Sequence, residues 1–346
     1  MANYVDTNLE PAVARFVGGF EGAMNRTPFT EFLTTLLKNG DYLFPEAESI
    51  KESSKRTVKA KIRKQVIEVA SGSRSCTLSG SFGDGATATM NWTSLALTGK
   101  VSTKQHQDNE IKLQEAIAGR IADLRKSVLK AFETQAQAWF AANRSTINAG
   151  ISYGTFNAAT NVFEIDPADA ANPGFLNVAE QVLGENQYRG GMYEAVVNGF
   201  TYPQLRYQSQ QGAGNSANLA FQFGNWLVKN GLGYNDVNYP NWFAYIFQEG
   251  MVGALNWLPA DYRSPREGQS VSDTMGVKMV MPDPEIMGLN WAVKTQLKCE
   301  DTTLTNGGDD DEVLYIQLST DLSFNYAPTS DGSTPILAIA SANVAP

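Results

Sequence analysis

The sequence is poor in the residues on which most catalytic and metal sites depend. Its 346 residues include one histidine, His106, and two cysteines, Cys76 and Cys299. His106 falls in a predicted turn, where we interpret it as a solvated or capping residue, so no Ser-His-Asp, Cys-His or two-histidine metal arrangement is predicted. The cysteines lie far apart and outside any CxxC spacing. We therefore expect neither a disulfide framework nor a zinc site, and interpret both cysteines as small buried or half-buried side chains.

Phosphate-binding loops, leader segments and membrane spans are missing as well. No GxxxxGK-S/T occurs and no GxGxxG follows a predicted strand, so a nucleotide site is not expected. The opening residues MANYVDTNLEPAV carry neither a basic region nor an apolar stretch. No apolar run approaches the roughly 20 residues that cross a bilayer. We expect a protein made in the cytoplasm, away from membranes, without catalytic residues, cofactor or metal.

What the chain does have is the composition of a folded protein with an uneven charge distribution. Hydrophobic residues make up 42% and charged residues 18%, which indicates a globular chain long enough for two or three packed units. Residues 1–150 carry 19 cations and 15 anions, whereas residues 151–346 carry 8 and 21, which gives −9 overall. A basic front and an acidic back favour head-to-tail association, although scattered charge explains the asymmetry equally well. The negative total argues against sequence-specific nucleic-acid binding.

Side-chain alternation marks a hairpin in the first third of the chain. In KESSKRTVKAKIRKQVIEVA, Lys, Thr and Arg alternate with Val, Ala and Ile, which is typical of a strand with one basic and one apolar face. A Thr-rich return strand is predicted at Ala86–Thr98, after a loop rich in Gly and Ser. Because a two-stranded ribbon is marginal in water, we expect residues 56–105 to form a finger that rests on a partner. The basic face is the candidate inter-subunit contact: Lys55, Lys59, Lys61 and Arg63.

The segments on either side of the hairpin have different characters. Before it, a helix is predicted at Thr30–Lys38, ended by Asn39-Gly40, and the rest of the first 50 residues is interpreted as an extended arm. After it, one very long helix is predicted at Asp108–Asn143, where Asp108 can cap the start. We interpret this helix as a beam along a flat domain rather than as a coiled coil. Its apolar stripe has spacings of three and four: Leu113, Ile117, Ile121, Leu124, Val128, Phe132, Ala136 and Trp139.

The second half is predicted to mix helices and strands without a βαβ rhythm. A helix is expected near Pro203, in YPQLRYQSQQ. The acidic run Asp309–Glu312 is interpreted as a solvated turn in preference to a cation site, because it lacks the alternating ligands of a calcium loop. Alternating apolar patterns predict five strands: Ala195–Val197, Trp242–Phe247, Val277–Met281, Leu289–Lys298 and Val313–Phe324.

This order of parts resembles the Hong Kong 97-type fold of tailed-bacteriophage major capsid proteins, an α+β fold. In that family an arm and an extended E-loop precede a spine helix, which crosses a peripheral domain beside an axial domain. FAYIFQEGMVGALNW and DPEIMGLNWAVKTQLKCE resemble later strands of the axial domain. The resemblance implies these divisions: 1–54, arm; 55–105, E-loop; 106–190, peripheral domain with the spine helix; 191–290, axial domain; 291–346, return strands and C-terminus.

The resemblance also implies a function in assembly, with no active site. Hexamers and pentamers of the chain would form an icosahedral shell in the virion, around double-stranded DNA that is contacted without specificity. Portal and scaffold or decoration proteins would be further partners, and assembly would take place in the host cytoplasm. Two alternatives stay open on the sequence. One is an encapsulin-like nanocompartment that encloses a cargo enzyme, and the other is an enzyme whose carboxylate site the sequence does not reveal.

Overall fold

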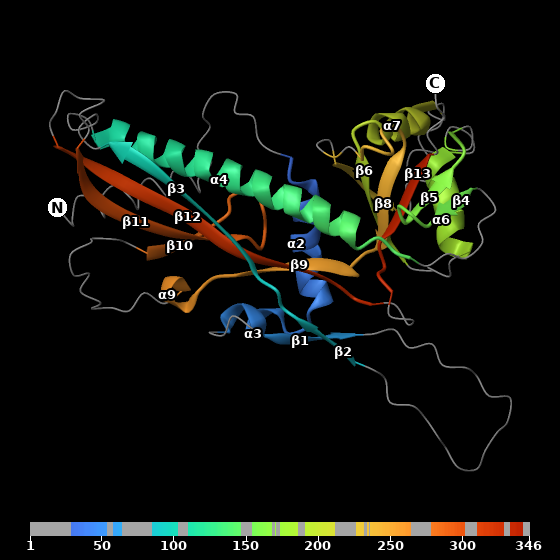
Figure 1. The fold of residues 1–346 in the computed structure, drawn as a ribbon, viewed down its shortest axis with the longest axis horizontal. Coiled ribbons are helices and arrows are strands. Elements are labelled where there is room, and N and C mark those ends of the chain that lie inside the picture. The colour runs from blue at the N-terminus through green and yellow to red at the C-terminus, as the bar shows by residue number, and fades with distance from the viewer. Residues whose placement is uncertain are drawn as a thin grey trace, which may run out of the picture.

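A computed structural model shows a long helix lying along one sheet, with a second sheet at the end of that helix (Figure 1). The statements below concern the residues that the structure describes: 29–53, 58–63, 85–102, 110–146, 154–167, 170, 174–185, 191–211, 226–231, 234, 236–263, 278–301, 310–328 and 333–341.

The first sheet has five strands and is organised around β12, the longest of them. Four strands follow the order β10-β11-β12-β3, and β9 pairs with the end of β12 beyond the reach of β11. All of these pairings are antiparallel. The strands are β3 (Thr93–Ser102), β9 (Val252–Trp257), β10 (Lys278–Pro282), β11 (Asn290–Asp301) and β12 (Asp310–Tyr326).

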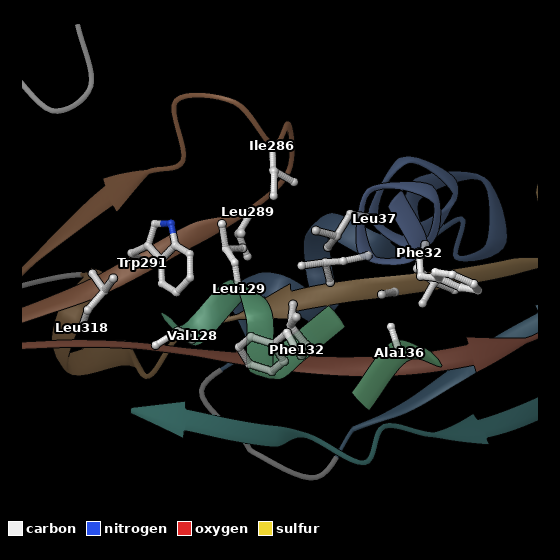
Figure 2. Close-up of a cluster of buried hydrophobic side chains, with 14 of the residues drawn as sticks. Phe32, Leu37, Val128, Leu129, Phe132, Ala136, Ile286, Leu289, Trp291 and Leu318 are labelled. Carbon is white, nitrogen blue, oxygen red and sulfur yellow. The ribbon is translucent and has the colours of Figure 1, made fainter. Parts of the chain in front are cut away.

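Helix α4 (Glu110–Ala142) covers one face of this sheet and confirms the predicted beam. The sheet contributes Trp291 and Leu318 to the shared core (Figure 2). Val293 belongs to the same core. Near the end of α4, Phe140 is fully buried and Trp139 only partly so, which moves the end of the predicted stripe by one residue. The predicted capping residue, Asp108, lies outside the described residues. The apolar stripe itself is buried as predicted: Leu113, Ile117, Ile121, Leu124, Val128, Phe132 and Ala136.

The second sheet has six strands in the order β4-β5-β13-β8-β6-β7 and a core of its own, against which α6 (Phe175–Glu185) packs. Strands β6 and β7 are parallel and are joined through α7 (Thr201–Gln211), so the expectation of no βαβ rhythm is wrong for this unit. The strands are β4 (Thr155–Asn157), β5 (Val162–Ile165), β6 (Tyr193–Asn198), β7 (Trp226–Gly231), β8 (Phe243–Gln248) and β13 (Leu337–Ser341).

The chain passes between the two sheets more often than its sequence order suggests. After α4, β4 and β5 lie in the six-stranded sheet rather than beside the helix. The strands β9, β10 and β11, which we expected in the same domain as β6 and β8, lie instead in the α4-covered sheet. Each predicted strand of the second half is nevertheless present, within a few residues of its expected bounds. Hydrophobic pattern identified these strands but did not identify their neighbours.

The N-terminal region is less extended than predicted. Helix α2 (Glu31–Leu43) continues through Asn39-Gly40, where we expected it to end, and α3 (Ala47–Glu52) follows it. Gly40 allows this continuation because its α-carbon lies against the backbone of β9, where a Cβ would meet the carbonyl oxygen of Ala254. Gly253 makes the same close approach from the strand side, since a Cβ there would lie 2.9 Å from the carbonyl oxygen of Asn39.

The return strand of the predicted finger is divided between two sheets in the structure. Strand β1 (Lys59–Arg63) pairs with β2 (Gly85–Thr89) as an antiparallel ribbon. The rest of the return strand is a separate strand, β3, which pairs with β12 and belongs to the five-stranded sheet. Residues 90–92 separate the two strands, and the side chain of Met90 is buried in the small core under the ribbon. The tip of the finger lies outside the described residues.

Three smaller predictions have different outcomes. Cys299 is exposed rather than buried or half-buried. The acidic residues 310–312 begin strand β12 and so do not form a turn. His106 and Cys76 lie outside the described residues.

The close approach of α2 and β9 predicts an unusual response to alanine. Alanine favours helices over glycine by about 1 kcal/mol, yet we expect Gly40→Ala to lower the free energy of unfolding by about 1–3 kcal/mol through overpacking. The matched control is Gly119→Ala in α4, because a Cβ at Gly119 has no neighbour within 4 Å. This control should be neutral or stabilising. Urea denaturation measures both variants, and equal effects would contradict the packing of α2 on β9.

Candidate assembly surfaces and the contacts that position them

The basic strand β1 has the two faces that its sequence predicts. Lys59 and Lys61 are exposed, whereas Ala60 and Ile62 are 1% and 3% exposed. The backbone of Arg63 lies in β1 opposite Gly85, which places it in register with the two lysines. Lys55 lies outside the described residues. The structure thus presents Lys59 and Lys61 together on the outer face of the ribbon.

The apolar face of the ribbon rests on its own chain, which corrects the expectation that the whole finger needs a partner. Ala60 and Ile62 belong to a small core with Ile50 of α3 and Leu255 of β9. Close to this core, the rings of Trp92 and Trp257 lie 5.9 Å apart between centroids. These contacts fix the direction of the β1-β2 ribbon on its own chain. Its outer face remains available for contact with another molecule.

Among the described residues, Lys59 and Lys61 have no carboxylate within ion-pair distance. Two ammonium groups two residues apart on one face of a strand repel each other, and an anionic partner relieves that repulsion. The geometry is therefore suited to contact with an acidic surface outside this part of the chain.

Arg125 fastens the middle of α4 to the turn between β10 and β11. Its Nε and Nη2 donate to the two carboxylate oxygens of Asp283 at 2.6 and 2.8 Å, and Nη2 also donates to Glu285 at 2.8 Å. Trp291 Nε1 donates to Asp283 at 2.8 Å. Burial opposes ionisation of Asp283, but these hydrogen bonds hold the pKa of its carboxyl below the ordinary value. A bidentate pair of this kind fixes the orientation of the turn on the helix.

Arg144 joins the end of α4 to the six-stranded sheet. Its Nη2 donates to Asp236 at 2.6 Å and to the Tyr245 hydroxyl at 2.8 Å, and its Nη1 donates to the carbonyl oxygen of Thr160 at 3.1 Å. Burial alone would lower the pKa of Arg144, but Tyr245 and Asp236 raise it above the ordinary value. Ser145 N donates to the carbonyl oxygen of Ile336 at 2.7 Å, just before β13. These contacts set the position of one sheet relative to the other.

Two buried carboxylates hold α2 in the space between the sheets. Glu133 of α4 is 4% exposed and accepts hydrogen bonds from the backbone N–H groups of Phe32 and Leu33, at 3.1 and 3.0 Å. These N–H groups belong to the first turn of α2 and have no partner within the helix. Glu194 of β6 is fully buried and accepts from the side chain of Asn39. Lys229 of β7 lies 3.8 Å from Glu194, and burial lowers the pKa of this lysine.

These polar contacts could not be predicted from the sequence because their partners lie far apart in the chain. Arg125 and Glu133 resemble ordinary solvated positions of a charged helix. They are buried only because the β10-β11 turn packs on Arg125 and the start of α2 packs on Glu133. Glu194 stands inside a run of apolar residues in β6, and this was the one available signal. A charged residue in the middle of a buried strand requires a partner.

The described part of the chain contains no grouping of three or more His, Cys, Asp or Glu side chains able to hold a metal ion. None of the helices in this part is both long and apolar enough to span a membrane. The features that the structure places on the surface are therefore faces and edges of sheets and helices.

Known structures share this architecture, although the sequence does not match known families. No protein-family model matches the chain, and no curated protein matches it. A chain of the cyanophage Pam1 capsid asymmetric unit superposes with a TM-score of 0.53 at 8% identity, over 92% of this chain and 93% of that one. The chain has the fold of a phage capsid protein. It is also similar to a chain of the Ralstonia phage GP4 capsid, with a TM-score of 0.49, 9% identity and 95% of each chain covered.

The Pam1 superposition spans both sheets and α4, since it covers nearly the whole chain. It confirms the predicted α+β class and the resemblance to phage capsid proteins at the level of the fold. A third similar chain, from Mycobacterium phage Adephagia, has a TM-score of 0.44 and 15% identity over 95% of this chain and 94% of that one. The fold shared with the Pam1 chain is accompanied by only 8% sequence identity.

Glu133 predicts a specific dependence of stability on pH. Burial raises the pKa of Glu133 from 4.5 to about 7, and the hydrogen bonds from Leu33 and Phe32 oppose this rise without cancelling it. Between these two pH values the folded chain binds more protons at Glu133 than the unfolded chain does. The stabilising contribution is therefore complete below about pH 4.5 and is lost as the pH rises through about 7. Glu31 and Gln137 are the other side chains that act on this carboxyl.

We expect wild-type stability, relative to a Glu133→Gln variant, to increase by about 1–3 kcal/mol between pH 8 and pH 5. Glutamine does not titrate, so the difference between the two proteins isolates this carboxyl. Urea denaturation at several pH values measures the difference. The control is Glu180→Gln, at an exposed position of α6. A Glu133→Gln difference that stays constant with pH would contradict the assignment.

Proposed function

We propose that this chain is a major capsid protein that self-assembles into an icosahedral shell. The observation that carries the proposal is the capsid fold over nearly the whole chain, shared with the Pam1 capsid chain. The fold supports a structural rather than an enzymatic role. Hexamers and pentamers of the chain would tile the shell, and the shell would enclose double-stranded DNA in the virion after assembly in the host cytoplasm.

The shape of the subunit supports this function on physical grounds. Strands β3 and β10 lie at the two edges of the five-stranded sheet, and β4 and β7 at the edges of the six-stranded one. Edge strands carry backbone groups that pair with other chains unless something covers them. The β1-β2 ribbon adds a projecting element whose apolar face is satisfied and whose basic face is exposed. A subunit with many such edges gains burial by meeting copies of itself.

The domain names of the Hong Kong 97-type family can be proposed for the observed layers. We assign α4 and the five-stranded sheet to a peripheral domain, with α4 as the spine helix. The six-stranded sheet with α6 and α7 is assigned to an axial domain, and the β1-β2 ribbon to the base of the E-loop. Portal and scaffold or decoration proteins are further proposed partners. Nothing in the described residues favours the encapsulin-like alternative.

The function is tested by the native mass of the purified chain. Sedimentation velocity at micromolar concentration in physiological salt should show rings or closed particles many times the monomer mass of 37.6 kDa. A stable, monodisperse monomer under these conditions would contradict the proposal.

The exposed face of the ribbon gives a specific prediction. Replacing Lys59, Lys61 and Arg63 together by glutamate should impair assembly, because the face would then repel the acidic surface that it is proposed to meet. Neutral glutamine at the same three positions should have a smaller effect. Far-UV circular dichroism should show unchanged helix content in both variants, because Lys59 and Lys61 are exposed. Normal particle formation by the glutamate variant would show that charge does not contribute to this contact.

A further inference from the structure

The five-stranded sheet has a second face, opposite α4, and this face is rich in lysine. Residues paired in an antiparallel register point to the same side of a sheet, and neighbours along a strand point to opposite sides. Trp291, Val293 and Ile316 point into the core beneath α4, so the positions between them face away. Three of the residues on this side are exposed lysines, and two others, a lysine and a tyrosine, are half-buried. We call the set the lysine face: Lys100, Lys294 and Lys298, with Lys278 and Tyr315.

Tyr315 lies at the centre of the lysine face. The ammonium groups of Lys100 and Lys298 each lie 4.8 Å from the centroid of its ring, one from β3 and one from β11. Lys294 is directly opposite Lys278 in the register of β11 and β10. Two of the four cations therefore lie over one ring, and the other two lie opposite each other on β11 and β10. The register also places the backbone of Glu300 opposite that of Asp311 on this side of the sheet, beyond Lys298, so the positive charge is concentrated between Tyr315 and β10.

The charge of this face is only partly neutralised by nearby groups. Lys278 lies 3.6 Å from Asp261 of α9 (Ala260–Arg263) and over the ring of Tyr262. Lys294 and Lys298 have no carboxylate within 4.0 Å among the described residues. Like charges directly opposite one another destabilise a sheet, and Asp261 offsets the charge of Lys278 but lies on the side of that lysine alone. An anionic partner at Lys294 would relieve the remaining repulsion.

A matching acidic surface lies on the same chain. Around α3, four acidic side chains are exposed, and Lys51 pairs with one of them at 2.8 Å. No other element of the described residues carries more than two exposed acids; the others are Glu115 and Asp123 on α4, Asp166, Glu180, Asp261 and Glu285. We call this set the acidic α3 surface: Asp41, Glu46, Glu48 and Glu52.

The two surfaces lie on the same side of the sheet at different ends. Leu255 of β9 pairs in register with Ser323, which is an even number of residues from Tyr315 and so shares its face. Leu255 packs against Ile50 of α3, which places α3 on that side. In Figure 1, α3 lies with β1 and β2 near β9, whereas β10, β11 and β12 extend away from it. One copy therefore has an acidic end and a basic end on the same side of the five-stranded sheet.

We propose that the lysine face binds the acidic α3 surface of a second copy of this chain. The inference rests on the proposed function and names one contact of the shell. Opposite charges at opposite ends of one side form a head-to-tail contact, and such contacts give rings when the rotation between successive copies closes. A second copy is favoured as the partner because every copy carries the acidic α3 surface, a local group of exposed carboxylates that is complementary in charge to the lysines.

A charge-swap experiment tests the contact in the full chain. Lys294→Glu with Lys298→Glu should raise the protein concentration needed for assembly by about tenfold or more, because carboxylates would then face carboxylates. Adding Glu46→Lys and Glu48→Lys to that variant should restore assembly toward the wild-type concentration. The matched control is Lys126→Glu with Lys130→Glu on α4, the same change of charge on the opposite side of the sheet. This control should assemble like wild type.

Each outcome of the experiment is decisive. Restored assembly in the four-residue swap, with a normal control, supports the contact. Normal assembly of the Lys294/Lys298 variant overturns it while leaving the proposed shell function intact, whereas a wild-type chain that never assembles overturns the shell function itself. Assembly that fails in the swap as well overturns the pairing with α3. Particles that form normally but lose bound nucleic acid identify the lysine face as a nucleic-acid surface and overturn the proposal.

Discussion

The structure depends on the burial of one face of α4 against the five-stranded sheet. At 1.5 Å per residue, this 33-residue helix is about 50 Å long, and apolar side chains are buried along its described length. Each such side chain stabilises the fold by about 1.5–3 kcal/mol, which makes this interface the main apolar contact between distant parts of the chain. Because α4 also carries Arg125, Glu133 and, just beyond its end, Arg144, its position determines where the remaining elements attach.

The polar contacts along α4 contribute more to orientation than to stability. A buried ion pair gains little over apolar packing, but the loss of one partner leaves an uncompensated charge. Arg125 fixes the β10-β11 turn, Glu133 fixes the start of α2, and Arg144 fixes the six-stranded sheet. Together they hold two sheets and a helix in a single arrangement. A shell subunit needs this property because its contacts with neighbours must recur at the same angles in every copy.

The sequence predicted the elements whose evidence is local. The three- and four-residue spacing identified α4, and alternation identified β1 and most strands of the second half. The sequence did not predict the features that depend on contacts between distant segments. Gly40 was interpreted as a helix end, since the strand that it approaches lies more than 200 residues further along the chain. The return strand of the finger was predicted as one piece because nothing local marks where pairing changes from β1 to β12.

The candidate surfaces, too, were predicted from the sequence only where the evidence is local. The basic face of β1 follows from alternation, and the structure exposes Lys59 and Lys61 as expected. The lysine face was not predicted because it combines residues from β3, β10, β11 and β12, which only the sheet order brings together. The asymmetry of charge between the two halves of the sequence gave no indication of it. Several of these lysines belong to the acidic half of the chain.

The central claim is that copies of this chain form a closed shell. Cryo-electron microscopy of particles formed by the purified chain tests it most directly. We expect closed icosahedral particles that contain fivefold and sixfold rings of this chain. Both sheets and α4 should fit the density of each subunit. Discrete monomers, or open filaments whose subunits lack such rings, would contradict it.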